Sequence, residues 1–279
     1  MQDTISHLRR RIAALEQAPP AFQPSPDSCH ARTGREGGRP ALSLGLARID
    51  QVLGGGLRRD GLHEIFAAGS GDTGAAFGFA AALAARLTAS PRDIREIVWI
   101  RQEFGALEAG DLYAPGLAAL GLDPARLILV TLRDPLAALR AGIEALRCTA
   151  LAGVVIELWG EPKALDLTAT RRMALAAQSS AVPALLLRPG GTPAPSAAET
   201  RWQVAALPSR PAPANAPGLP AFEITLLRQR AGVAGRTWRV EWNRDRQSFR
   251  PAAPLSRPVV PVPVRRPAAA EPIPFARTG

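Results

Sequence analysis

Short runs of continuous apolar residues alternate with longer segments of helical periodicity between residues 41 and 188. Strands that are apolar on both faces are typical of a parallel sheet, and amphipathic segments between them are typical of the helices that cover it. The pattern therefore predicts an α/β fold with a mostly parallel central sheet flanked by helices. The expected strands are 61–67, 96–101, 126–131, 153–159 and 183–188, and the expected helices are 74–87, 106–121, 135–149 and 163–179.

The pattern changes in the C-terminal third of the chain. Residues 189–220 are rich in Pro, Ala and Gly and are expected to be loop insertions around one strand at 199–207. The segments 222–230 and 236–242 alternate between apolar and polar residues and flank the sequence AGVAG, which predicts a C-terminal β-hairpin. The Pro- and Arg-rich residues 250–279 are expected to form a disordered basic tail.

The N-terminal residues follow a different pattern. Residues 1–17 are expected to form an amphipathic helix, followed by a linker at 18–40 and by the α/β domain at 41–249. An isolated helix of this length is marginal in water, so it needs a surface to pack on. That surface is either its own domain or a partner protein, and the sequence leaves both open. The apolar stripe of this candidate partner helix consists of Ile5, Leu8, Ile12 and Leu15.

Composition excludes several classes of protein. No stretch approaches the roughly 18 consecutive apolar residues of a membrane span. The N-terminus also lacks the apolar region and the small-residue cleavage site of a signal peptide. We therefore expect a soluble, cytoplasmic protein. The two cysteines and three histidines are scattered along the chain, so no metal site is expected.

Positive charge is concentrated at the C-terminal end of the chain. Residues 188–279 carry 14 arginines and five acidic residues, whereas the whole chain has a net charge of +10. This asymmetry indicates contact with a polyanion or with an acidic partner surface. Nearly all the cations are arginines and the chain has 27 prolines, so a GC-rich codon bias is the alternative explanation.

Arginine and tryptophan side chains are interleaved in this basic region. Such a mixture suits single-stranded nucleic acid, because arginines contact phosphates and aromatic rings stack on bases. The alternation equally suits an ordinary half-buried hairpin with solvated arginines. The candidates for DNA or partner contact are Arg201, Trp202, Arg228, Arg230, Arg236, Trp238, Arg239, Arg244 and Arg246.

A phosphate-binding loop is expected between the first strand and its helix. In the motif GxxxxGK[ST], backbone N–H groups cradle phosphates, the lysine neutralises them and the hydroxyl holds Mg²⁺. Here Gly69 and Gly74 have the right separation, but Ala75 and Ala76 replace the lysine and the hydroxyl residue. The loop is either a plain strand-to-helix turn or a weak ATP site that uses bare N–H groups, so no cofactor is assigned. This vestigial nucleotide loop consists of Gly69, Ser70, Gly71, Asp72, Thr73, Gly74, Ala75 and Ala76.

The surrounding sequence resembles RecA over most of residues 42–190. LGLARIDQVLGGGL and GLHEIF are similar to the segment that leads into RecA's first core strand and to that strand. The resemblance places Glu103 on RecA's catalytic carboxylate, and Glu157 where the second nucleotide-site strand ends in Asp. In RecA, the region after the fifth core strand includes a DNA-contacting loop.

A narrower resemblance covers about residues 42–245. LGLARIDQVLGGGLRRDGLHEIFA, a glycine-rich loop without lysine, and VVIELWGEPKALDLTATRRMALAAQSS are similar to the ImuA family. This family is the RecA-like accessory component of the bacterial damage-inducible mutagenesis cassette.

The ImuA resemblance implies a non-catalytic adaptor in translesion DNA synthesis, that is, in SOS mutagenesis. The implied partners are an ImuB-like polymerase homologue, an error-prone alpha-type DNA polymerase and RecA, with DNA bound directly or through them. Two alternatives stay open. Glu103 would serve a divergent but active RecA-type ATPase that depends on DNA, and a RecA-like core without a working loop also fits an SOS cell-division inhibitor.

Overall fold

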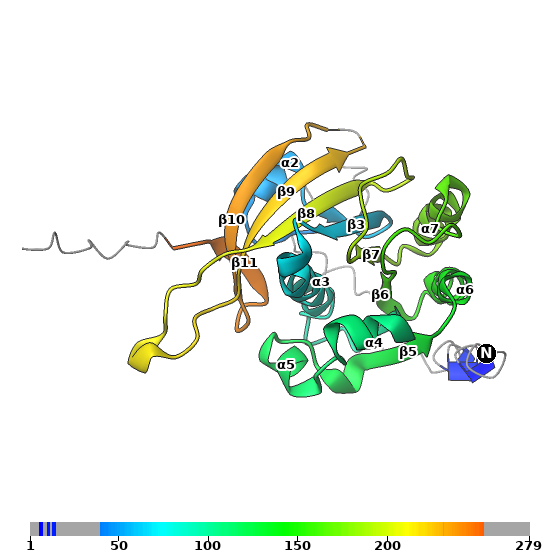
Figure 1. Ribbon diagram of the computed structural model, residues 1–279, viewed down its shortest axis with the longest axis horizontal. Helices are drawn as coiled ribbons and strands as arrows, with labels where there is room; N and C mark the ends of the chain where they lie inside the picture. The colour runs from blue at the N-terminus through cyan, green and yellow to red at the C-terminus, as the bar shows by residue number, and fades with distance from the viewer. Residues whose placement is uncertain (1–5, 8–9, 12, 15–39, 231, 254–279) are drawn as a thin grey trace, which may run out of the picture.

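The centre of the computed structural model is a nine-stranded sheet with the strand order β11-β10-β9-β8-β3-β7-β6-β4-β5 (Figure 1). The strands from β8 to β5 pair in parallel, and β9, β10 and β11 continue the sheet in antiparallel fashion. The expected α/β class with a mostly parallel sheet is confirmed. The strands are β3 (Leu62–Ala67), β4 (Glu96–Gln102), β5 (Leu127–Leu132), β6 (Leu151–Glu157), β7 (Ala184–Arg188), β8 (Thr200–Ala206), β9 (Ala221–Gln229), β10 (Arg236–Asn243) and β11 (Ser248–Pro251).

The structure describes residues 6–7, 10–11, 13–14, 40–230 and 232–253. The expected linker and most of the expected tail therefore lie outside the described residues. Within the described part of the chain, no helix is long and apolar enough to cross a membrane. A separate two-stranded ribbon of β1 (Ala41–Leu42) and β2 (Leu57–Arg58) precedes the main sheet.

Helices cover both faces of the sheet (Figure 1). One face carries α3, whose buried residues share a core with α2 and α5, and the other carries α6 and α7. The parallel strands are therefore covered from both sides, which explains why their sequences are continuously apolar. The helices are α2 (Ala47–Val52), α3 (Thr73–Leu87), α4 (Glu103–Ala109), α5 (Ala114–Ala119), α6 (Pro135–Leu146) and α7 (Leu167–Ser180).

Small residues on α3 let this helix lie close to the sheet. Phe79 is the largest of its fully buried side chains, and its ring centroid lies 6.1 Å from that of Trp202 of β8 and 5.4 Å from that of Phe249 of β11. This contact connects the parallel part of the sheet with its antiparallel extension. Because Phe79 is fully buried, replacing it with alanine is expected to cost about 3–5 kcal/mol of stability.

The helices on the opposite face begin at carboxylate caps. The Asp134 side chain accepts hydrogen bonds from the amides of Leu136 and Ala137, and Asp166 accepts one from Ala169. Such caps satisfy amides that have no partner within the helix. They also set the boundary of α7, which begins at Leu167 and not at residue 163 as the sequence pattern indicated.

The prediction of a single helix at 106–121 is wrong. The chain forms two short helices, α4 and α5, separated at Gly110, whose φ of 75° lies in the left-handed region that favours glycine. α4 also begins at Glu103, directly after β4. This early start brings the α4 backbone over the carboxyl end of the neighbouring strand.

The hairpin expected at 222–230 and 236–242 is confirmed as β9 and β10, which pair from Arg236 opposite Leu226 to Glu241 opposite Ala221. The strand expected at 199–207 is confirmed as β8. The predicted start of the tail at residue 250 is wrong, because Arg250 and Pro251 belong to β11 and pair with β10. The loop between β8 and β9 extends away from the sheet (Figure 1).

Candidate functional site

The vestigial nucleotide loop connects β3 to α3 at the carboxyl edge of the parallel strands. Gly69 precedes a single 3-10 turn at Ser70–Asp72, and α3 begins at Thr73. The Thr73 hydroxyl donates a hydrogen bond to the Ser70 carbonyl oxygen at 2.9 Å. The loop therefore satisfies part of its own polar backbone and forms the compact strand-to-helix turn that the sequence allowed.

Asp72 attaches this loop to the neighbouring strand. Its Oδ1 atom accepts a hydrogen bond from the backbone amide of Ala206, at the end of β8, at 2.8 Å. A negative charge thus lies at the start of α3, where the helix dipole favours an anion. In a working phosphate loop that place belongs to a phosphate group. The carboxylate adds charge of the wrong sign for nucleotide binding.

A groove of about 690 Å³ opens beside the loop, and we call it the carboxyl-edge groove. None of the residues that line it is basic, and two of them, Glu108 and Asp111, are acidic. Ala75 and Ala76 provide no cation either, and Ala76 is fully buried. The groove is lined by Ala67, Ala68, Gly69, Ser70, Thr73, Gly74, Phe77, Glu108, Ala109, Gly110, Asp111, Leu112, Tyr113, Trp159, Gly190 and Gly191.

Glu157, at the end of β6, is fully buried. Its carboxylate accepts hydrogen bonds from Trp159 Nε1 at 2.8 Å, Arg101 Nη2 at 3.3 Å and Trp99 Nε1 at 3.4 Å. Burial raises the pKa of this carboxyl, while the hydrogen bond from Trp159 and the charge of Arg101 act in the opposite direction. The group is held by three donors of its own domain.

The backbone of α4 covers the Glu157 carboxylate. A Cβ atom added at Gly105 would lie 2.3 Å from Glu157 Oε1 and 2.6 Å from Trp159 Nε1. Such an approach is possible only because Gly105 has no side chain. The α4 backbone therefore separates this carboxylate oxygen from solvent.

Glu103 lies at the first position of α4 and is exposed. Its Oε2 atom lies 2.6 Å from Arg133 Nε, in an ion pair on the surface. Glu103 directly follows β4 and Glu157 is the last residue of the neighbouring strand β6. Glu103 is paired at the surface, whereas Glu157 is covered.

Two of the expected surface contacts are wrong. Trp202 is fully buried in the core, and Arg201 is buried beside Glu64, with 2.7 Å between Arg201 Nε and Glu64 Oε2. Arg201 also donates to the Ser196 hydroxyl at 2.9 Å. Both residues stabilise the fold. A sequence signal for this pair existed, because Glu64 interrupts a strand that is otherwise apolar and needs a buried cation beside it.

The other candidate arginines are spread over the antiparallel end of the sheet. Arg228 is half-buried and donates to the Ser196 carbonyl oxygen at 2.7 Å. Arg239 pairs with Glu223 at 3.0 Å and Arg244 with Asp245 at 3.6 Å. The exposed members of the predicted set are Arg230, Arg236, Arg239, Arg244 and Arg246.

Trp238 is half-buried, and its ring centroid lies 6.2 Å from that of Trp202. It lines a groove of about 480 Å³ together with Arg236 and with Arg48 of α2, and we call it the Trp238 groove. Arg48 could not be predicted from the sequence pattern, because only the folded chain brings α2 beside β10. Arginines from two distant segments thus flank one aromatic ring. The full lining is Arg48, Gln51, Val52, Gly232, Val233, Arg236 and Trp238.

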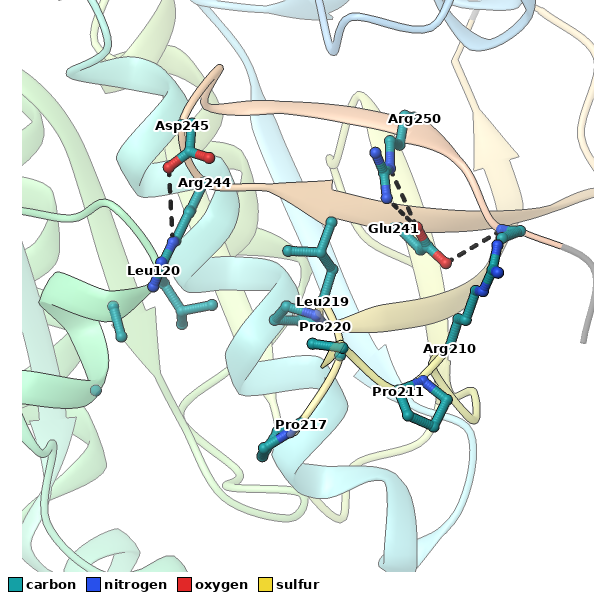
Figure 2. Close-up of a pocket in the computed structure, with 15 residues that line it drawn as sticks. Leu120, Arg210, Pro211, Pro217, Leu219, Pro220, Glu241, Arg244, Asp245 and Arg250 are labelled. Carbon is teal, nitrogen blue, oxygen red and sulfur yellow. Dashed lines mark hydrogen bonds and ion pairs between the residues drawn. The ribbon is translucent and has the colours of Figure 1, made fainter. Parts of the chain in front are cut away.

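A further groove of about 680 Å³ lies between α5, the loop after β8 and the β10–β11 turn. Figure 2 shows Arg250 beside Glu241 and Arg244 beside Asp245 at this groove, which we call the arginine groove. Arg210 lines it as well. Its charges are largely balanced, because Arg250 Nη2 lies 2.9 Å from the buried Glu241 carboxylate and Arg244 Nε lies 3.6 Å from Asp245.

The predicted apolar stripe of the N-terminal helix, Ile5, Leu8, Ile12 and Leu15, lies outside the described residues. Two neighbours of the stripe are described. His7 and Arg11 line a small pocket with residues 127–131 of β5, and Arg11 Nη2 lies 3.7 Å from Glu96 Oε1. This part of the segment lies on its own domain, against the edge strand of the sheet (Figure 1).

Metal coordination has no candidate in the part of the chain that the structure describes. No group of three or more His, Cys, Asp or Glu residues is found there that could hold a metal ion.

Known proteins resemble this chain in sequence and in fold. No family model matches the chain. The fold is similar to a crystal structure of the RadB recombinase, with a TM-score of 0.48 and 16% identity over 75% of this chain and 98% of that one. The chain is 36% identical over 211 residues to Protein ImuA of Caulobacter vibrioides, in each of two strains. This match spans 70% of the chain and 81% of the relative. The chain belongs to the ImuA family.

Proposed function

We propose that this protein is a non-catalytic adaptor in damage-induced translesion DNA synthesis. It helps to assemble a complex that contains an ImuB-like polymerase homologue and an error-prone alpha-type DNA polymerase, with RecA as a further contact. Membership of the ImuA family supports the role in mutagenesis and the ImuB-like partner. The error-prone polymerase and RecA are proposed as partners because the resemblance to the ImuA family implies them.

The single observation that carries the adaptor role is the state of the former nucleotide site. Hydrolysis needs a cation and Mg²⁺ at the phosphates and a carboxylate that positions the attacking water. Ala75 and Ala76 supply neither a cation nor a metal-ligating hydroxyl in the loop, and the Asp72 carboxylate is bonded to the Ala206 amide. Of the two carboxylates that follow the neighbouring strands, Glu103 is paired with Arg133 and Glu157 is covered by α4. A site without these groups does no phosphoryl chemistry, so a fold retained around it serves binding.

The exposed basic side chains of the C-terminal third are the proposed contact surface. They lie at the Trp238 groove, on the other face of β10 and on the β10–β11 turn, together with the loop after β8. Clustered arginines raise the local concentration of a polyanion or an acidic partner surface. DNA reaches this surface directly or through the polymerase partners. The proposed contact residues are Arg48, Arg230, Arg236, Trp238, Arg239, Arg244 and Arg246.

Affinity capture after DNA damage tests the adaptor role. The bait is full-length protein, compared with a variant in which Arg230, Arg236 and Arg239 are changed to glutamate. A matched control changes three other exposed arginines to glutamate. They are Arg140 on α6, Arg147 just after α6 and Arg171 on α7. We expect the first variant to lose at least one polymerase partner and the control to keep all of them. Equal capture by all three baits contradicts the assigned surface.

An SOS cell-division inhibitor is the competing binding function. Overexpression separates the two, because an inhibitor produces filamentous cells. We expect normal division and an altered frequency of damage-induced mutation. Filamentation with unchanged mutation frequency contradicts the adaptor role.

A further inference from the structure

Apolar side chains are exposed around the carboxyl-edge groove. Phe104, Leu107 and Tyr113 expose 51%, 84% and 71% of their surface, and all three belong to α4 or to the segment just after it. The Phe104 ring packs edge-on against Trp159 with 6.1 Å between the centroids. An exposed cluster of large apolar residues beside a groove marks an interaction site. Tyr113 lines the groove, and Phe104 adjoins it through its contact with Trp159.

The charge of the same surface is negative. Glu108 and Asp111 line the groove and no basic residue does. Two buried arginines lie near the groove. Arg101 is engaged by the Glu157 carboxylate and by the Gly110 carbonyl oxygen at 3.0 Å, and Arg188, beside Gly191, donates to the Gly160 carbonyl oxygen at 2.9 Å. An aromatic groove with a carboxylate rim disfavours phosphate and favours a cationic segment with apolar residues. Grooves lined by aromatic rings are the usual receptors of proline-rich segments in an extended left-handed helix.

The chain itself contains a segment with this chemistry. Residues 254–279 include Arg257, Arg265, Arg266 and Arg277 against the single acidic residue Glu271, and prolines recur through them. The stretch RPVVPVPVRRP at 257–267 combines proline, valine and arginine. Its prolines and valines match an aromatic groove, and its arginines match Glu108 and Asp111 through charge-assisted hydrogen bonds.

The segment starts close to the groove. The described chain ends at Ala253, which lines the arginine groove with Leu120, just past the end of α5. Tyr113 of the carboxyl-edge groove directly precedes α5, and a helix of six residues is about 9 Å long. A proline-rich extended chain covers about 3.1 Å per residue. Residues 257–267 are therefore well within reach.

We propose that the carboxyl-edge groove binds residues 257–267 of the same chain. The prolines and valines of the segment lie against Tyr113 and Trp159, and Arg265 and Arg266 pair with Glu108 and Asp111. The site that holds a nucleotide in working members of the fold thus holds a basic, proline-rich peptide here. The docking of this segment does not depend on the adaptor role, and different measurements test the two.

Cysteine cross-linking in the full-length protein tests the docking. In a Cys29→Ser background, Leu107→Cys is combined with Val262→Cys and treated with a short bifunctional maleimide. The matched control places the first cysteine at Leu175 of α7, which is 57% exposed on the opposite face of the sheet. We expect an intramolecular cross-link from position 107 and none above background from position 175. A synthetic peptide of residues 254–269 should compete with it.

Charge reversal identifies the contacts that hold the segment. Arg265→Glu with Arg266→Glu in the cross-linking background should lower the yield from position 107 about fivefold or more, since each exposed pair contributes a modest free energy. Because residues 265–266 lie outside the described domain, unchanged circular dichroism is expected and serves as the folding control. Equal yields from positions 107 and 175, a cross-linked dimer in place of the monomer, or a yield that ignores the charge reversal each overturn the proposal.

Discussion

The carboxylate of Asp72 is bonded to the backbone amide of Ala206, with 2.8 Å between Oδ1 and N. The bond joins the loop after β3 to the end of β8, the strand beside it in the sheet. A loop that closes on its own sheet has no need of a ligand to order it. The loop that has alanines in place of the lysine and the hydroxyl residue thus makes a structural contact of its own.

Gly105 is expected to be intolerant of any side chain. Gly105→Ala forces α4 away from Glu157 and Trp159, because its Cβ would lie within 2.3–2.6 Å of their polar atoms. We expect a loss of about 1–3 kcal/mol in the free energy of unfolding, measured by urea denaturation. The control is Gly74→Ala in α3, whose Cβ meets nothing within 4 Å. A neutral Gly105→Ala would mean that α4 does not cover Glu157.

His63 is expected to make stability depend on pH. The imidazole is buried between the Thr200 hydroxyl and the Arg58 carbonyl oxygen, each at 2.8 Å, and burial lowers its pKa to about 3. Its pKa in the unfolded chain is about 6.5, so the unfolded state alone gains a proton as the pH falls below that value. Stability is full above pH 6.5 and decreases toward pH 3.

The size of this effect is about 2 kcal/mol between pH 7.5 and pH 5, from the proton uptake of the unfolded state alone. Denaturant titrations at the two pH values measure it. His63→Gln should be less stable at pH 7.5 but should change much less between the two values. An equal pH dependence in both proteins would place the titration on other groups.

Arg201 is expected to affect folding and not partner binding. Arg201→Met leaves the Glu64 carboxylate buried without its cation, and breaking a buried pair in this way costs about 3–5 kcal/mol. Thermal unfolding checks this value. Adding Glu64→Leu should recover only part of the loss, because the buried Arg188 then lacks the nearby Glu64 charge that favours its charged form. A stable Arg201→Met protein with weakened DNA or partner binding would restore the role expected from the sequence.

The Trp238 groove is expected to contact single-stranded nucleic acid. Arg48→Glu with Arg236→Glu should weaken binding of a fluorescent oligothymidine at low salt and reduce the salt dependence by about 0.7 per lost phosphate contact. Fluorescence anisotropy at several salt concentrations measures both quantities. The control, Arg147→Glu at the end of α6, removes a similarly exposed arginine and should change little. Equal binding by the two variants contradicts a role of this groove.

The elements of the fold could largely be predicted, because the buried strands of a parallel sheet are continuously apolar and the helices between them are not. The break in the predicted helix 106–121 could not, although Gly110 marks it, since glycine inside a helical pattern is often tolerated. β11 was missed because its short sequence lies within proline- and arginine-rich surroundings.

The site was only partly accessible from sequence. Ala75 and Ala76 reveal the missing groups directly, since that argument needs no coordinates. The cover that α4 places over Glu157 depends on the approach of Gly105, which is a tertiary contact. The pairing of Arg201 with Glu64 and the meeting of Arg48 with Trp238 depend on which strands and helices become neighbours. Spacing along the chain carries no information about such contacts.

The claim that this protein is non-catalytic is tested most directly by a phosphate-release measurement on the full-length protein with ATP, Mg²⁺ and single-stranded DNA. The absence of a cation in the loop and the covered Glu157 predict release at the level of the blank, unchanged in Glu103→Gln and Glu157→Gln variants. Weak ATP binding without turnover is compatible with this result. Sustained turnover that disappears in Glu103→Gln would contradict it and would make the protein an active ATPase.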